Sequence, residues 1–304
     1  MTANQKLLVT GGSGLIGSTI STSFKPTRNS LNLMHIDDIV RYITRNDIDS
    51  IIHCAGKVGG VKANKTKLGE FFYENIIINT NVLEAARVCE IKKVVSFMST
   101  CVFPDGATLP LTSDQIHDGE PHSSNYAYAY AKRMVDVQSR AYREQYGCDY
   151  VTIIPCNVYG PNDYYNLDDS HVIPALIHKC YIAKRDNTDF EVWGNGEPLR
   201  EFLYSEDAGK IAKMALESYN DKHPMIISPD AEHSISEVVN TIVDILGYSG
   251  TVRYMDKELK GQHRKPSDNK KFKLHYPDFK FTPIREGLEK SIKWFIENYE
   301  KARK

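Results

Sequence analysis

The chain has 304 residues, 41% of them hydrophobic, and a formal net charge of -1. A chain of this length and composition can bury a full-sized core in one large α/β unit or in two lobes. The nearly neutral charge argues against a nucleic-acid-binding protein and against a membrane-surface protein, because both usually need a strong excess of basic residues.

The six cysteines show no C-x-x-C spacing. This usage is typical of free thiols in a reducing compartment, and no metal site is predicted. Residues 1–6 have no apolar signal region, and no apolar run approaches the roughly 20 residues that a membrane-spanning helix needs. We therefore expect a cytoplasmic protein with no nucleic-acid partner and no membrane contact.

Strand and helix patterns alternate along the first half of the chain. An apolar strand runs into a glycine-rich turn that a helical pattern follows, and the later strands are rich in β-branched residues. The predicted strands cover 6–10, 48–55, 94–99 and 150–154, and long helices cover 70–90 and 126–146. This alternation predicts an α/β fold with a Rossmann-like doubly wound parallel sheet.

The pattern changes after Gly160 and Pro161. Loops, short helices and turn residues are expected to about residue 200, as in inserted substrate-binding structure. A helix at 206–219 and the apolar run 225–227 are expected to return the chain to the sheet, and 235–304 is typical of a smaller mixed α/β lobe. The prediction is a Rossmann domain with a smaller mixed α/β C-terminal substrate-binding lobe.

The turn after the first strand has the spacing Gly11-x-x-Gly14-x-x-Gly17. Glycines allow a ligand to approach the backbone closely, and a helix N-terminus offers unpaired N–H groups to a pyrophosphate. The candidate cofactor-binding residues of this turn are Gly11, Gly12, Ser13, Gly14, Leu15, Ile16 and Gly17. The alternative is an ordinary glycine-rich turn between a strand and a helix.

The segment after this turn favours NADP(H) over NAD. An acid that would bind the ribose 2′-hydroxyl is absent between Gly17 and Ile36, whereas Lys25 and Arg28 are available to pair with a 2′-phosphate. The second strand is poorly marked in this region, so Arg28 could instead be a charge on a surface loop.

A second group of residues suits the reduction of a carbonyl. Tyr128 and Lys132 are four residues apart on the helix predicted at 126–146, so their side chains share one face. A lysine ammonium beside the phenol would lower the tyrosine pKa from about 10 and let the hydroxyl protonate a carbonyl oxygen. Ser99, at the end of the third strand, can bond the same oxygen, and Cys101 shares its face if the strand continues. A lone Y-x-x-x-K arises by chance, and Ser99 could simply bond backbone.

Strings along nearly the whole chain closely resemble the GDP-L-fucose synthases, members of the extended short-chain dehydrogenase/reductases. They lie at 11–17 (GGSGLIG), 57–60 (KVGG), 99–104 (STCVFP), 128–134 (YAYAKRM), 157–161 (NVYGP), 170–176 (SHVIPAL) and 193–202 (WGNGEPLREF). The resemblance implies a bifunctional enzyme that epimerises GDP-4-keto-6-deoxy-D-mannose at C3 and C5 and then reduces C4 with NADPH. Residues 1–160 would then be an NADP-binding domain to which the chain returns at about 203–228, and residues 161–202 and 229–304 a nucleotide-sugar-binding lobe.

The resemblance also assigns roles to residues. It implies Cys101 as the base and His171 as the acid of epimerisation, with Ser99, Tyr128 and Lys132 serving reduction. The implied cofactor contacts are the glycine turn, Arg28, Ser99, Lys132, Pro155, Cys156, Asn157 and Val158, and the implied GDP-sugar contacts are Lys179, Trp193 and Arg200. A homodimer through the helices at about 70–90 and 126–146 is expected as well. From the residues alone, Cys101 could be a small buried apolar residue and His171 a loop histidine.

Two positions depart from the family pattern. Lys260 stands where an Asp precedes a Gly in relatives, and Asn162 stands where many relatives have His. Two other functions stay open. One is an NAD-dependent nucleotide-sugar 4-epimerase, against which Arg28, Cys101 and His171 argue; the other is a non-catalytic NADP-binding regulator, which would not need Tyr128 and Lys132.

Overall fold

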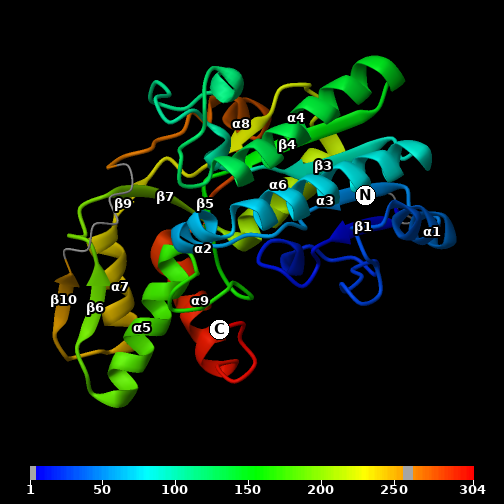
Figure 1. Ribbon diagram of the computed structural model, residues 1–304. Coiled ribbons are helices and arrows are strands. Elements are labelled where there is room, and N and C mark those ends of the chain that lie inside the picture. Colours follow the sequence, from blue (N-terminus) through cyan, green and yellow to red (C-terminus); the bar gives the residue numbers. More distant parts are fainter. Residues whose placement is uncertain (1–4, 256–262) are drawn as a thin grey trace.

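A five-stranded parallel sheet lies at the centre of this computed structural model, which describes residues 5–255 and 263–304 (Figure 1). The strands stand in the order β1-β2-β3-β4-β8. They are β1 (Leu7–Thr10), β2 (Ser50–His53), β3 (Lys93–Phe97), β4 (Asp149–Pro155) and β8 (Met225–Ile227). Because every pair is parallel, the carboxyl ends of all five strands lie along one edge of the sheet.

After β1 and the glycine turn, the chain passes along the side of β1 that β2 does not occupy. Leu8 forms a parallel bridge with Phe24, and the N–H of Val9 donates to the carbonyl oxygen of Phe24 over 3.0 Å. Since β2 occupies the other side of β1, the winding of the chain reverses at β1. The predicted doubly wound sheet is thus confirmed, and the carboxyl end of β1 is a position where such sheets bind ligands.

The helix predicted directly after the glycine turn is wrong. Only one 3₁₀ turn, η1 (Gly17–Thr19), follows it. The hydroxyls of Ser18 and Thr19 donate to the carbonyl oxygens of Leu15 and Ile16, over 3.3 Å and 2.7 Å. These local bonds compete with helix formation, and Pro26 soon forces an extended backbone. The first full helix is α1 (Ile36–Asn46).

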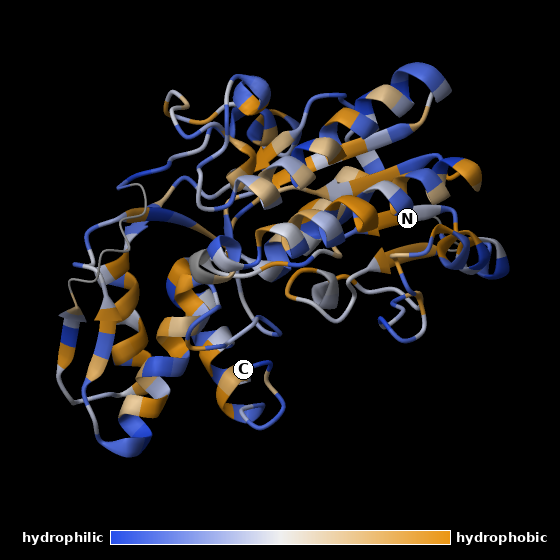
Figure 2. Cartoon of the chain, viewed as in Figure 1, coloured by the Kyte–Doolittle hydropathy of each residue, from blue (hydrophilic) through white to orange (hydrophobic). Residues whose placement is uncertain are grey.

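Helices cover both faces of the sheet. One face packs against α1, α3 (Leu68–Val88) and α4 (Tyr126–Tyr146), and the other against α6 (Ser205–Ser218) and the short α8 (Lys270–His275). Successive strand residues point to opposite faces, so Val94 joins the first core and Val95 the second. Burial on both faces explains the nearly continuous apolar strands, which stand out in Figure 2.

A second body lies beyond the carboxyl edge of the sheet, at the lower left of Figure 1. Its apolar core gathers residues from α5, α7 and α9 and from the strands beside them. Its elements are β5 (Asn157–Tyr159), α5 (Val172–Asp186), β6 (Phe190–Trp193), β7 (Leu199–Tyr204), β9 (Glu232–Ser234), α7 (Ile235–Leu246), β10 (Val252–Met255) and α9 (Ile284–Glu297). The expectation that loops, short helices and turn residues dominate to about residue 200 is wrong, because α5 alone has 15 residues.

The chain passes between the sheet and the lobe several times. β7 pairs with β5 and β9 and leads into α6 on the sheet, and α8 packs against β8 before α9 rejoins the lobe core. The remaining helices are α2 (Val61–Thr66), η2 (Thr100–Val102) and η3 (Ser113–His117). The division at residues 161, 203 and 229 stays a prediction.

Candidate active site

The glycine turn lies at the carboxyl end of β1, and its shape depends on missing side chains. Gly11 has φ 67°, and a Cβ there would lie 2.8 Å from the Cα of Ala55. A Cβ on Gly17 would lie 2.3 Å from the carbonyl oxygen of Gly11. The N–H of Gly14 closes the turn on that same oxygen over 2.9 Å. The turn therefore brings all seven predicted residues together as a cradle of closely approachable backbone, the arrangement that suits a pyrophosphate.

The two cations after the turn differ in exposure. Arg28 is 80% exposed, and its Nη2 lies 3.8 Å from Oε2 of Glu74 on α3. Lys25 instead packs against Gly12 and donates to the carbonyl oxygen of Ser18 over 3.0 Å. Partial burial lowers the pKa of Lys25. Of the two cations that the sequence offered for a 2′-phosphate, Arg28 is the one whose guanidinium stays open to a ligand.

Ser99 and Tyr128 meet where β3 ends. Tyr128 is 8% exposed and packs edge-to-face on Phe71, with ring centroids 6.3 Å apart. Burial raises the pKa of its phenol and the neighbouring Cys101 raises it further, whereas a hydrogen bond from the Ser99 hydroxyl lowers it. The structure thus brings together the two hydroxyls that sequence reasoning placed on one substrate oxygen.

Lys132 lies one turn further along α4 and is 5% exposed. Its Nζ donates to the carbonyl oxygen of Phe97 over 3.1 Å. Burial lowers the pKa of Lys132 to about 8, partly offset by Cys54. The predicted lowering of the Tyr128 pKa does not occur in this arrangement: burial raises it, and Lys132 is not among the groups that shift it.

The shared face of Ser99 and Cys101 is conditional on the strand continuing, and the strand does not continue: Cys101 lies inside the 3₁₀ turn η2. Ser99 caps that turn, and the N–H of Cys101 donates to the Ser99 Oγ over 3.3 Å. The half-buried thiol packs against a small cluster of Ala63, Phe71 and Tyr128. The tight turn therefore keeps Cys101 beside Tyr128 even though strand geometry has ended.

His171 is exposed and directly precedes α5. The loop that leads to it packs against Gly60, whose N–H donates to the carbonyl oxygen of Asp169 over 2.6 Å. A Cβ on neighbouring Gly59 would touch Ala63 and Phe71, at 3.0 Å and 3.1 Å, so these two glycines join the His171 loop to the cluster around Cys101.

Sequence reasoning missed Asp163, a buried acid beside His171. Asp163 is 4% exposed, its Oδ1 accepts the N–H of Tyr164 over 2.7 Å, and its Oδ2 has no hydrogen-bond partner among the described residues. Burial raises its pKa to about 6, and His171 offsets part of that rise. Nothing local in the sequence marks this residue, because its burial depends on the lobe.

The other predicted cofactor residues follow β4 at the same edge of the sheet. Pro155 ends the strand, Cys156 is buried, and Asn157 is exposed with its side-chain amide donating to the carbonyl oxygen of Glu201 over 2.9 Å. Val158 is half-buried. The segment 155–158 thus shares the carboxyl edge with the glycine turn.

The three predicted sugar-nucleotide contacts lie in the lobe. The Nζ of Lys179 on α5 lies 3.7 Å from the ring centroid of Trp193 on β6, a cation–π pair. Arg200 on β7 donates to the carbonyl oxygens of Leu199 and His263, over 2.7 Å and 3.4 Å. Lys179 and Trp193 therefore form one unit, and Arg200 lies on a different strand.

Of the two positions that depart from the family pattern, the structure describes one. Lys260, with Gly261 and Gln262, lies outside the described residues. Asn162 adopts a left-handed backbone with φ 62°, which Asn tolerates better than most residues. Its amide donates to the Oγ of Ser18 over 3.3 Å, so it ties the loop before His171 to the glycine turn.

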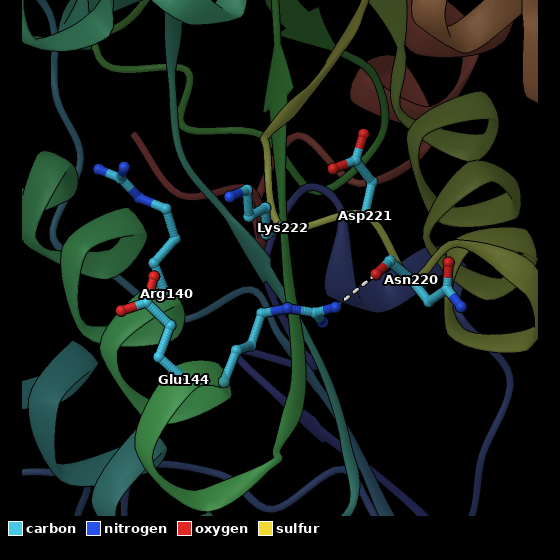
Figure 3. Close-up of a pocket in the computed structure, with 6 residues that line it drawn as sticks. Arg140, Glu144, Asn220, Asp221 and Lys222 are labelled. Carbon is cyan, nitrogen blue, oxygen red and sulfur yellow. Dashed lines mark hydrogen bonds between the residues drawn. The ribbon is translucent and has the colours of Figure 1, made fainter.

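A separate pocket of about 340 Å³ lies on the surface at the opposite edge of the sheet (Figure 3). Arg140 follows Tyr128 by twelve residues on α4, so the pocket is about 18 Å further along the helix. The guanidinium of Arg140 points away from Asn220 in Figure 3 and pairs with Asp136 over 2.8 Å. Arg143 is bound to Asp149 and to the Asn220 carbonyl oxygen. This pocket belongs to the amino ends of the strands, whereas parallel sheets bind ligands at the carboxyl ends.

Within the described parts of the chain, no group of three or more His, Cys, Asp or Glu side chains is arranged to hold a metal ion. Among the same residues, no helix is long and apolar enough to cross a membrane.

Known proteins resemble this chain in sequence and in fold. The family model described as NAD dependent epimerase/dehydratase family matches residues 7–228. A GDP-L-fucose synthase from Dictyostelium discoideum is 43% identical over 316 residues, which covers 100% of this chain and 99% of that protein. The GDP-L-fucose synthase of Escherichia coli (strain K12) is 30% identical over 321 residues, 99% of each chain. The crystal structure of a GDP-L-fucose synthetase from Naegleria fowleri bound to NADP has a TM-score of 0.94 and 36% identity, covering 100% of this chain and 96% of that one.

Proposed function

Because this chain belongs to the NAD dependent epimerase/dehydratase family, and within it to the GDP-L-fucose synthases, we propose that it converts GDP-4-keto-6-deoxy-D-mannose to GDP-L-fucose. It is an NADP-dependent oxidoreductase with epimerase activity. The observation that carries the assignment is the cluster at the end of β3, where Ser99, Cys101 and Tyr128 are in contact and Lys132 lies one helical turn away.

The residues of the glycine turn fit a dinucleotide. The positive φ of Gly11 and the missing Cβ of Gly17 leave the backbone open at the switch point of the sheet. When bound, NADPH supplies the hydride for reduction at C4. Arg28 would pair with the 2′-phosphate, while Lys132 and the segment 155–158 would hold the other end of the cofactor.

Epimerisation requires removing and returning a proton at C3 and at C5, both of which are α to the C4 ketone. The Cys101 thiolate takes the proton and becomes a thiol, the electron pair of the broken C–H bond forms a C=C bond to C4, and the π pair of the C4 carbonyl moves to its oxygen. Hydrogen bonds from Ser99 and Tyr128 stabilise the resulting enolate. His171 then delivers a proton to the opposite face of the ring. Before the second carbon reacts, Cys101 returns its proton to solvent and His171 takes one up.

Reduction at C4 uses the same two hydroxyls in another way. The phenol of Tyr128 donates its proton to the C4 oxygen, and Ser99 holds that oxygen in place. The raised pKa of the buried phenol means that Tyr128 keeps its proton until the oxygen becomes basic. The ammonium of Lys132 stays fixed by Phe97.

The GDP part of the substrate would lie against the lobe. Trp193 offers an aromatic face for stacking, and Lys179 and Arg200 offer positive charge for the diphosphate. Since Lys179 already covers the Trp193 ring, a stacked base would displace it toward the diphosphate.

One assay tests the whole assignment: NADPH oxidation with GDP-4-keto-6-deoxy-D-mannose, followed by identification of the sugar product by NMR. We expect one NADPH consumed for each GDP-L-fucose formed. Interconversion of the configuration at C4 without net use of NADPH would instead indicate a nucleotide-sugar 4-epimerase, and cofactor binding without turnover would indicate a regulator.

We also propose a homodimer through α3 and α4, which pack against each other. Large apolar side chains stay exposed on these helices, among them Tyr73 (59%), Val88 (50%) and Val137 (40%). Covering such residues is a common reason for helices to pair between subunits. Val137→Glu should reduce the mass measured by light scattering, whereas Leu274→Glu on α8 should not, although Leu274 is 82% exposed.

A cytoplasmic location completes the proposal. All six cysteines are free thiols, which is typical of proteins kept in a reducing compartment.

A further inference from the structure

Lys265 lies against the turn that carries Cys101, although it follows Cys101 by 164 positions in the sequence. Its Nζ donates a hydrogen bond to the carbonyl oxygen of Thr100 over 2.9 Å. Thr100 directly precedes Cys101 in η2. The next residue, Pro266, also holds this segment in place, because its carbonyl oxygen accepts a hydrogen bond from the N–H of Leu111 over 2.9 Å. The lysine therefore has a fixed position one residue from the thiol.

The groups that face the Cys101 thiol and the Lys265 ammonium come from several elements of the fold. Cys101 faces Tyr128 from α4 and Lys265 from the lobe, while α2 and α3 contribute the uncharged Ala63 and Phe71. Lys265 in turn faces Cys101, Arg200 and Asp105. Its own pKa is lowered by burial and raised by Cys101, so the lysine and the thiol act on each other.

Three neighbouring cations are directed elsewhere. Arg264 pairs with Glu232 across the lobe, and Arg200 donates to two carbonyl oxygens. Lys132 donates to Phe97 and faces Cys54. Two cations among the described residues bind the Cys101 turn itself: Lys265 through Thr100, and Arg133 of α4, whose Nε donates to the carbonyl oxygen of Val102 over 2.6 Å. Of these two, Lys265 is the one whose pKa Cys101 raises, whereas Arg133 faces Tyr130.

We infer that Lys265 is a positioning residue whose ammonium stabilises the thiolate of Cys101. A nearby lysine favours the charged form of a cysteine, and a half-buried site screens that attraction less than water does. Lys265 keeps its own proton throughout and transfers none. The inference rests on the proposed function only for its purpose, which is to supply thiolate for proton abstraction at C3 and C5.

The test measures the thiol directly, without sugar turnover. Full-length wild type, Lys265→Met, Lys265→Arg and Arg264→Met are alkylated with iodoacetamide across a series of pH values, and the modified Cys101 peptide is quantified by mass spectrometry. Cys89 and Cys148, both half-buried and remote from Lys265 in sequence, serve as internal controls in the same digest.

We expect the pH midpoint of Cys101 alkylation to rise by about one unit in Lys265→Met, the size of effect of one nearby charge. Lys265→Arg should keep the wild-type midpoint, and Arg264→Met should do so because that guanidinium is paired with Glu232. Identical midpoints in wild type and Lys265→Met would overturn the inference. Met keeps the apolar stem of this half-buried lysine and should leave the fold intact, and Lys265→Gln, which keeps a donor for Thr100 without the charge, should show the same rise.

Solvent deuterium exchange separates this inference from the proposed function. In Lys265→Met the exchange rate at C3 and C5 should fall most at low pH and recover as pH rises. If the alkylation midpoint moves but Cys101→Ser still exchanges these protons at the wild-type rate, Lys265 acts on the thiol and a different group is the base. If the alkylation midpoint does not move in Lys265→Met while Cys101→Ser loses exchange, Cys101 is the base and Lys265 does not stabilise its thiolate.

Discussion

The Nζ of Lys132 lies 3.1 Å from the carbonyl oxygen of Phe97, so the lysine of α4 is tied to the last residue of β3. This bond fixes α4 relative to the strand end that carries Ser99 two residues later. The phenol of Tyr128, one turn earlier on α4, is thereby held against the Ser99 hydroxyl. In the proposed reduction, this pairing holds the proton donor beside the C4 oxygen.

Tyr128→Phe removes the proton donor and keeps the ring that packs on Phe71. We expect NADPH-dependent turnover to fall by roughly two to four orders of magnitude, the usual contribution of a general acid. Cofactor affinity, measured by fluorescence titration, should stay close to that of the wild type. Nearly normal turnover would mean that another group protonates the C4 oxygen.

Arg28→Ala should weaken NADPH binding and spare NADH, because only the 2′-phosphate contact is lost. The guanidinium is 80% exposed and its pairing with Glu74 is long, so the melting temperature should change little. Kd values for both cofactors provide the measurement. Lys25→Ala is the comparison, since Lys25 packs on the glycine turn and should weaken both cofactors alike. Equal losses for NADPH and NADH in Arg28→Ala would reject the assignment.

Cys101→Ser should stop solvent deuterium from entering the sugar at C3 and C5, because a serine hydroxyl is seldom ionised near neutral pH. Ser99, Tyr128 and Lys132 remain, so slow NADPH-dependent reduction of the un-epimerised ketone to a D-configured 6-deoxyhexose should persist. NMR of the product sugar distinguishes the two outcomes. Unchanged formation of GDP-L-fucose with deuterium at both carbons would show that the thiol is only a packing residue.

His171→Gln should differ in kind from Cys101→Ser. Exchange through Cys101 should continue in part, whereas inverted product should become scarce because the acid on the opposite face of the ring is missing. His171 is exposed, so the substitution should leave stability unchanged. The ratio of deuterium exchange to inversion is the quantity to compare; equal losses of both would mean that His171 does not act separately.

Asp163→Asn should change how stability depends on pH. The carboxyl has a pKa of about 6 in the folded protein against an ordinary 3.8, so its contribution to stability is fully present below about pH 4 and is lost as pH rises through 6. Asn stays neutral and keeps an oxygen for the Tyr164 N–H. At pH 7 the variant should be more stable by at most about 3 kcal/mol, and near pH 3 the two proteins should match. Urea unfolding at a series of pH values gives the comparison; parallel curves would show that Asp163 titrates normally.

Local patterns in the sequence were enough to predict the sheet, the glycine turn and the helix that carries Tyr128 and Lys132. Each depends on spacing within about twenty residues: alternation for buried strands, Gly11 and Gly17 for the turn, and a four-residue step for one helix face. The helix predicted after the turn failed, because Ser18 and Thr19 bond the backbone locally and the connection to Phe24 is short.

Only the tertiary structure decided what surrounds the proposed base and acid. Cys101 remains beside Tyr128 through a 3₁₀ turn rather than a strand, Lys265 reaches that turn from the far end of the chain, and Asp163 is buried beside His171 by the lobe. The electrostatic environment of a side chain depends on burial and on charges brought near by folding, and such contacts between distant segments leave no period or spacing in the sequence.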